Sequence, residues 1–256
     1  MAGLRNLLSR SFKALSAGTV LWCATGEVAA SERVHLELVM AVDCSSSVNR
    51  DEFVLQMEGI AAAFEDPEVL AALEQVGEQG VAVSLLQWSS AGAQAKTIPW
   101  TRISTQTEAL AFSAQVRSAG RQILGGATAL GNAIDAATRW IQGNAYLGER
   151  MVIDVSGDGR SNEGGSPAYA RAVANRAGIT INGLAILNEE PELARYYVAG
   201  VVGGPGAFLL SADDFDDFAT AMRRKLYFEI AGPPVADAPQ AKPARAPLVT
   251  QLWQEK

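Results

Sequence analysis

Short apolar runs alternate along the chain with segments in which apolar residues recur every three or four positions. The first run covers residues 34–42, and the helical pattern over residues 50–64 begins next to Asn49, a residue suited to capping a helix. Buried runs of this length, separated by crossover helices, are typical of a parallel sheet. The pattern therefore predicts an α/β fold with a doubly wound, mostly parallel central sheet flanked by helices.

The remaining elements are predicted from the same two periods. Strands are expected at residues 81–88, 151–155, 179–187 and 207–210, with one short antiparallel edge strand at 98–100. Helices are expected at residues 107–118, 128–142, 167–177 and 213–228. No internal repeat interrupts this order, so one domain is expected over residues 33–230.

The first thirty residues do not share this pattern. Three basic side chains precede an apolar stretch over residues 14–24, and Val28-Ala29-Ala30 supplies the small residues that signal peptidase prefers. Residues 1–30 therefore read as a signal peptide, which predicts a periplasmic or secreted protein. The apolar stretch is shorter than the roughly 20 residues that span a bilayer, so no stable membrane insertion is expected after cleavage. A cytosolic amino terminus is the alternative interpretation.

The charge, the cysteine count and the composition of the carboxyl-terminal residues each exclude a feature of the protein. The net charge is −7 and the chain has no basic stripe, which argues against a nucleic-acid partner. Cys23 falls in the predicted signal peptide, so Cys44 is left without a disulfide partner in the exported chain. Residues 231–256 are rich in Pro and Ala without an apolar period, and a solvated tail is expected there.

The informative side chains lie where strands end, because open α/β sheets bind ligands outside the carboxyl ends of their strands. Asp43, Ser45 and Ser47 follow the first strand, and Asp158 follows the strand predicted at 151–155. Thr128 opens a predicted helix between them. All five offer oxygen atoms, which suit Mg²⁺, with Mn²⁺ or Ca²⁺ as alternatives, rather than zinc. The competing interpretation is turn and helix-capping chemistry, which also favours Asp and Ser.

This donor set predicts a binding mechanism. Two carboxylates nearly neutralise the charge of a bound dication. Together with three hydroxyls, however, they offer too few strong donors to fill its coordination sphere, so waters complete it. One metal-bound water could then yield to a carboxylate from a partner. The expected partner is therefore a protein that presents an acidic side chain.

The same residues resemble a known family. Asp43-x-Ser45-x-Ser47 is similar to the metal-ion-dependent adhesion site (MIDAS) of von Willebrand factor A domains, as are Thr128-x-x-Gly131 and Asp158-Gly159 in their order along the chain. The resemblance implies that the three hydroxyls contact the metal and that the two aspartates act largely through waters. Ser156-Gly157 departs from the Leu-Thr pair of many A domains.

The resemblance covers most of residues 33–230 and extends to a subfamily. Residues 152–159, 178–184 and 203–208 look like a bacterial group of exported A-type domains with no assigned function. This narrower likeness supports the fold and the site and implies no ligand beyond the cation.

Three functions remain open on the sequence. A metal-dependent binding module that is not an enzyme is favoured; a metal-dependent hydrolase and a structural subunit that binds sister chains are the alternatives. Ser-His-Asp and Cys-His catalysis are improbable, because both need a histidine beside the nucleophile. His35 is the only histidine, and it lies in the first strand, far from the predicted site. No basic general-acid candidate is expected near the site either. Cys44 is expected to point away from the metal, into packing.

Overall fold

The computed structural model describes residues 31–232 of the chain. The predicted signal peptide lies outside these residues, as does the tail predicted over residues 231–256 apart from its first two residues, of which Ala231 ends a helix. The central sheet has six strands in the order β3-β2-β1-β4-β5-β6. β3 is antiparallel to β2, and the other neighbours are parallel. The strands are β1 (Glu32–Asp43), β2 (Val81–Trp88), β3 (Gln94–Ile103), β4 (Tyr146–Gly157), β5 (Ile179–Ile186) and β6 (Leu209–Ala212).

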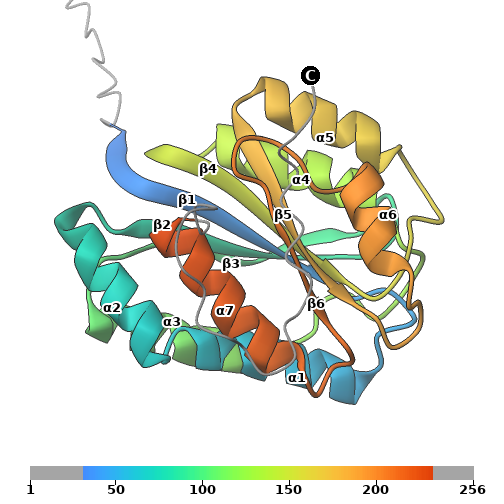
Figure 1. Ribbon diagram of the computed structural model, residues 1–256, viewed down its shortest axis with the longest axis horizontal. Coiled ribbons are helices and arrows are strands. Elements are labelled where there is room, and N and C mark those ends of the chain that lie inside the picture. Colours follow the sequence, from blue (N-terminus) through green and yellow to red (C-terminus); the bar gives the residue numbers. More distant parts are fainter. Residues whose placement is uncertain (1–30, 233–256) are drawn as a thin grey trace, which may run out of the picture. The chain divides into compact units, whose positions relative to one another are not determined.

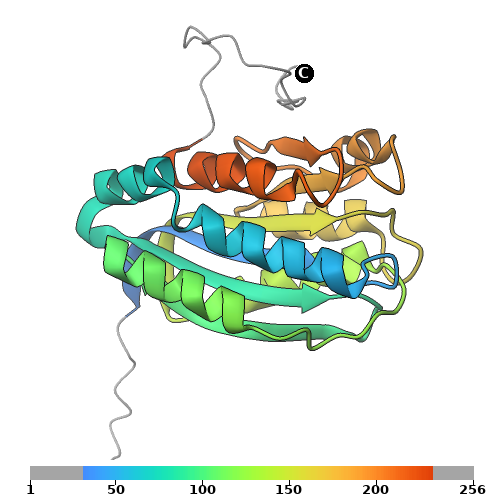
Figure 2. The ribbon, with the colours of Figure 1, turned by 90° about the horizontal axis from the view of Figure 1, so that it is seen from below.

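Helices cover both faces of this sheet (Figures 1 and 2). One face carries α1 (Arg50–Ala63), α2 (Pro67–Val76), α3 (Gln106–Ser118) and α7 (Phe218–Ala231). The other face carries α4 (Leu130–Gln142), α5 (Pro167–Arg176) and α6 (Leu193–Gly200). The predicted doubly wound, mostly parallel α/β fold with an antiparallel edge strand is confirmed. No helix within residues 31–232 is both long and apolar enough to cross a membrane.

β1 lies at the centre of the sheet and contributes to both halves of the core. Leu38 and Met40 pack toward α1 and α7, whereas Val39 and Ala41 pack toward α4 and its neighbours. Because both faces of the strand are buried, its sequence is a nearly continuous apolar run rather than an alternating one. This is the run that the sequence presents as residues 34–42.

The order of the strands decides where a ligand can bind. The chain adds β2 and β3 on one side of β1 and then returns to place β4 on the other side. The carboxyl ends of β1 and β4 are therefore neighbours, with Val42 paired to Ser156. Helices leave these two ends in different directions, which opens a crevice at the point where the strand order reverses.

The edge strand is longer than the three residues predicted. β3 spans Gln94–Ile103. Polar residues such as Lys96 and Arg102 interrupt its apolar positions, so most of the strand does not appear as an apolar run. An edge strand is paired on one side only, so its composition is less constrained than that of a central strand. Pro99 lies at a shift in the β2–β3 register, a position that tolerates its missing N–H.

Two helices, α2 and α6, are not predicted from the apolar pattern. α2 does carry a local signal, since the Asp66 carboxylate accepts the N–H of Glu68 at 2.9 Å and Pro67 occupies the first turn. α6 has eight residues and no side-chain cap, which is too short for a helical period to show. By contrast, Asn49 caps α1 as predicted, in a reciprocal pair with Glu52.

Candidate metal site at the carboxyl ends of β1 and β4

Four of the five predicted residues are joined by hydrogen bonds. Asp43 ends β1, and its Oδ1 accepts the backbone N–H of Ser45 at 2.7 Å. The hydroxyls of Ser45 and Ser47 are 3.2 Å apart, and the Ser47 hydroxyl donates to Oδ1 of Asp158 at 2.7 Å. Side chains more than a hundred positions apart in the chain therefore meet because β1 and β4 are adjacent.

Thr128 is brought to the same place by its own loop. It lies before α4, which begins at Leu130 rather than at residue 128 as predicted, so its side chain belongs to the loop rather than to a helix face. Its N–H donates to Asn162 Oδ1 at 2.8 Å, and the N–H of Asn162 donates back to its carbonyl at 2.9 Å. Its hydroxyl would lie 3.9 Å from a Cβ built on Gly159. The Thr128 hydroxyl thus lies beside the Asp158-Gly159 pair.

The loop that carries Thr128 is also joined to the loop after β1. The N–H of Ser46 donates to the carbonyl of Gly126 at 2.9 Å, and the N–H of Gly126 donates to the Ser46 hydroxyl at 2.9 Å. Gly126 has a φ of 121°, and a Cβ there would lie 2.5 Å from the Ser90 hydroxyl. Glycine is therefore required at this junction for both backbone conformation and space.

Arg121 is a residue of this region that the sequence did not reveal. Its guanidinium donates to the carbonyl oxygens of Ile123 at 2.8 Å, Cys44 at 2.9 Å and Asn49 at 3.1 Å. Arg121 is thus a basic side chain beside the site, at a position that the sequence pattern did not indicate. Because its nitrogens donate to backbone carbonyls of this loop, Arg121 holds the loop after β1 in place. Nothing in its local sequence signals this role.

The two aspartates are buried with little compensating charge. Burial, and after it the charge of Asp158, raises the pKa of Asp43 to about 7, while the Ser45 hydrogen bonds and Arg121 act in the opposite direction. Burial also raises the pKa of Asp158, and the charges of Glu52 and Glu189 add to this effect. Oδ2 of Asp43 and Oδ2 of Asp158 are both buried and have no hydrogen-bond partner within residues 31–232.

These features fit a divalent cation. Buried carboxylate oxygens that lack partners are costly, and a nearby cation would offset this cost. Within residues 31–232, no three His, Cys, Asp or Glu side chains gather into a metal cluster. The group at β1 and β4 instead combines two carboxylates with hydroxyls, the donor set of a hard cation. Which atoms hold a metal stays a prediction.

Two other residues lie where the sequence predicted. Cys44 is fully buried in the core on the α1 side, and burial raises the pKa of its thiol to about 12, so it is not a nucleophile at neutral pH. His35 lies in the amino-terminal half of β1, with its ring nitrogen 3.2 Å from Glu149. Neither residue takes part in the Asp43 group.

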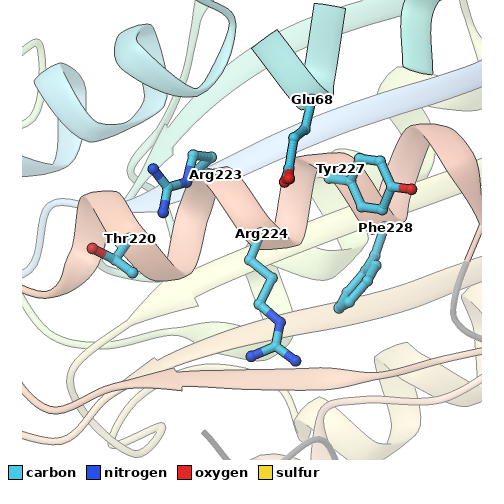
Figure 3. Close-up of a pocket in the computed structure, with 6 residues that line it drawn as sticks. All are labelled: Glu68, Thr220, Arg223, Arg224, Tyr227 and Phe228. Carbon is cyan, nitrogen blue, oxygen red and sulfur yellow. The ribbon is translucent and has the colours of Figure 1, made fainter. Parts of the chain in front are cut away.

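A pocket of about 340 Å³ lies between α2 and α7 (Figure 3). Glu68 extends from α2 toward α7, which supplies Arg224, Tyr227 and Phe228 among the lining residues. None of these residues belongs to the group at the ends of β1 and β4.

Comparison with known proteins gives the family. Residues 33–234 match the family described as "Protein of unknown function (DUF1194)". The chain belongs to the DUF1194 family. No curated protein matches it.

Solved structures of three proteins share the fold of this DUF1194 protein. They are proximal thread matrix protein 1 from the mussel byssus with a zinc-occupied MIDAS motif (15% identity, TM-score 0.56), the open conformation of the pilus adhesin SpaC from Lactobacillus rhamnosus GG (12%, 0.56) and a von Willebrand factor type A protein from Catenulispora acidiphila (17%, 0.51). The matches cover 78%, 77% and 77% of this chain but 49%, 30% and 43% of those chains. The chain thus spans less than half the length of each, and the likeness establishes a von Willebrand factor A-like fold.

Proposed function

We propose that this protein is a metal-dependent protein-binding module that is periplasmic or secreted and is not an enzyme. In this proposal Asp43, Ser45, Ser47, Thr128 and Asp158 hold one divalent cation, and the cation binds a carboxylate of a partner protein. The observation that carries the proposal is the hydrogen-bonded group of hydroxyls and carboxylates in which two buried carboxylate oxygens lack partners. The zinc-occupied MIDAS of the byssus protein supports a cation in a domain of this fold.

The donor set favours Mg²⁺, with Mn²⁺ or Ca²⁺ as alternatives. Hydroxyl and carboxylate oxygens are hard ligands, and Mg²⁺ keeps several waters when a protein offers few charged donors. The hydroxyls of Ser45, Ser47 and Thr128 would contact the cation, and the two aspartates would orient its waters. When bound, the cation supplies an electrophilic position for an oxygen ligand.

The surroundings of the site make a cation necessary for an acidic partner. Asp158, Glu52 and Glu189 are close enough for their charges to interact, so a partner carboxylate would be repelled in the absence of metal. Leu124 is 88% exposed and is followed by Gly125, where a Cβ would lie 3.1 Å from the Ser46 hydroxyl. An apolar side chain at the rim suits a partner whose acidic residue is flanked by apolar surface.

The first test measures the cation. Mg²⁺ titrated into the purified protein should raise its unfolding temperature, since a ligand that binds only the folded state stabilises it. Asp43→Ala should abolish this gain, whereas Asp51→Ala, which removes an exposed carboxylate from α1, should preserve it. An equal gain in the Asp43→Ala variant would refute the metal site.

The second test measures the partner. Immobilised protein in Mg²⁺ should capture a protein that a chelator elutes, and Asp43→Ala should capture none of it. Turnover in a phosphatase and esterase screen with Mg²⁺ or Mn²⁺, lost in Asp43→Ala and Asp158→Ala, would instead favour a hydrolase. Chelator-sensitive self-association in light scattering would identify a sister chain as the partner.

A further inference from the structure

Tyr197, on α6, is a buried tyrosine whose hydroxyl has no hydrogen-bond partner in the part of the chain that the structure describes. Its position is defined by the glycine before Asp158. A Cβ built on Gly157 would lie 2.9 Å from the Tyr197 hydroxyl and 2.8 Å from Oδ2 of Asp43. The phenol oxygen and the unpartnered oxygen of Asp43 therefore border the same small space at the end of β4.

This contact explains why position 157 is a glycine. Gly157 lies in β4 and is not among the glycines with positive φ, so its backbone conformation is open to any residue. What a side chain would meet is the phenol of Tyr197 and the carboxylate of Asp43. Glycine is needed here to leave space and not to allow a turn.

A second glycine makes room for the ring of the same tyrosine. A Cβ on Gly183, in β5, would lie 2.9 Å from Cδ1 of Tyr197. β4 and β5 are neighbours, with Gly183 paired to Val155 and Gly157 two residues further along β4. Two glycines on adjacent strands thus let the ring cross the sheet surface so that the hydroxyl reaches the end of β4.

The two unpartnered oxygens have complementary chemistry. An ionised carboxylate oxygen only accepts hydrogen bonds, whereas a phenol donates one. The other oxygen of Asp43 already accepts the N–H of Ser45 at 2.7 Å. A water molecule can accept from a phenol and donate to a carboxylate at once, which would give both oxygens of Asp43 a partner and prevent the carboxylate from rotating.

We propose that Tyr197 is a positioning residue of the metal site, which donates through water to Oδ2 of Asp43 and so orients that carboxylate toward the cation and its waters. The inference rests on the proposed function, because the orientation of Asp43 matters only if a cation is bound. Gly157 and Gly183 are part of this arrangement, because side chains at these positions would collide with Tyr197.

The test is Tyr197→Phe, which removes the hydroxyl and keeps the ring. Without metal, this variant should unfold within a few degrees of the wild-type temperature, because only one water-mediated hydrogen bond is lost and the ring stays in place. Its Mg²⁺ affinity, measured by calorimetric titration, should fall by about five- to tenfold, the effect of one hydrogen bond. Tyr169→Phe, at an exposed tyrosine on α5, is the matched control and should change neither quantity.

The Mg²⁺ affinities of the wild type and of Tyr197→Phe distinguish failure of the Tyr197 role from failure of the metal site. Unchanged Mg²⁺ affinity in Tyr197→Phe, with the wild type binding Mg²⁺, overturns the role of Tyr197 but not the metal site. A lower unfolding temperature in chelator with unchanged affinity shows a purely structural tyrosine and also overturns the proposal. Failure of the wild type to bind Mg²⁺ overturns both.

A double-mutant cycle tests the pairing of Gly157 with Tyr197. Gly157→Ala should lower Mg²⁺ affinity more in the wild-type background than in the Tyr197→Phe background, because Tyr197→Phe removes one of the two atoms that the new methyl would meet. Equal effects of Gly157→Ala in both backgrounds would show that the phenol and the glycine are independent, contrary to the proposal.

Discussion

The replacement of Asp43 by Asn should stabilise the metal-free protein, in a pH-dependent way. Asp43 has a pKa of about 7 when folded and 3.8 as an unperturbed carboxyl, so the folded state binds its proton more tightly than the unfolded state. Its contribution to the free energy of unfolding therefore falls as pH rises from about 4 to 7 and stays low above that. About 3 pKa units at 1.36 kcal/mol each give a penalty of about 4 kcal/mol at pH 8.

An Asn side chain has no charge to bury and can still accept the N–H of Ser45 through its oxygen. In chelator, Asp43→Asn should match the wild type in its free energy of unfolding near pH 4 and exceed it by up to about 4 kcal/mol at pH 8. Urea denaturation at several pH values measures this difference. Excess Mg²⁺ at pH 8 should raise the stability of the wild type and leave that of the variant unchanged.

Asp51→Asn is the control, because Asp51 is an exposed carboxylate in the first turn of α1 and its neutralisation should change stability by no more than about 1 kcal/mol. The reasoning is refuted if Asp43→Asn is less stable than the wild type in chelator at pH 8. A difference between the two that does not change between pH 4 and pH 8 would also refute it.

Three further predictions concern other parts of the structure. Lys225→Met should cost about 3–5 kcal/mol in urea denaturation, since this buried ammonium lies 3.0 Å from Asp154 and its loss leaves buried carboxylate charge unpaired. Gly131→Ala should destabilise by about 1–3 kcal/mol despite its better helix propensity, because the methyl would lie 2.1 Å from the carbonyl oxygen of Gly165; thermal unfolding checks this. Leu124→Ser should leave the unfolding temperature and Mg²⁺ affinity unchanged and weaken partner capture, since Leu124 is exposed at the rim; full capture would exclude the rim contact.

The strands that are most deeply buried were the easiest to predict from the sequence. β1 and β5 are buried on both faces, so their apolar runs stand out and their predicted positions were close to those observed. β3, at the edge, has polar residues such as Lys96, and only its centre was predicted. α6 was missed because eight residues hold too few helical turns for a period to appear.

The sequence by itself determined that oxygen-bearing side chains follow the central strands, and right-handed crossovers of a parallel sheet bring such strand ends to one edge. It could therefore predict that Asp43, Ser47 and Asp158 would meet. Only the tertiary structure decided that Arg121 holds the loop after β1 and that Tyr197 reaches the space beside Gly157. Periodicity records whether a residue is buried within its own element, but contacts between distant elements depend on how these elements pack in three dimensions, which no local pattern encodes.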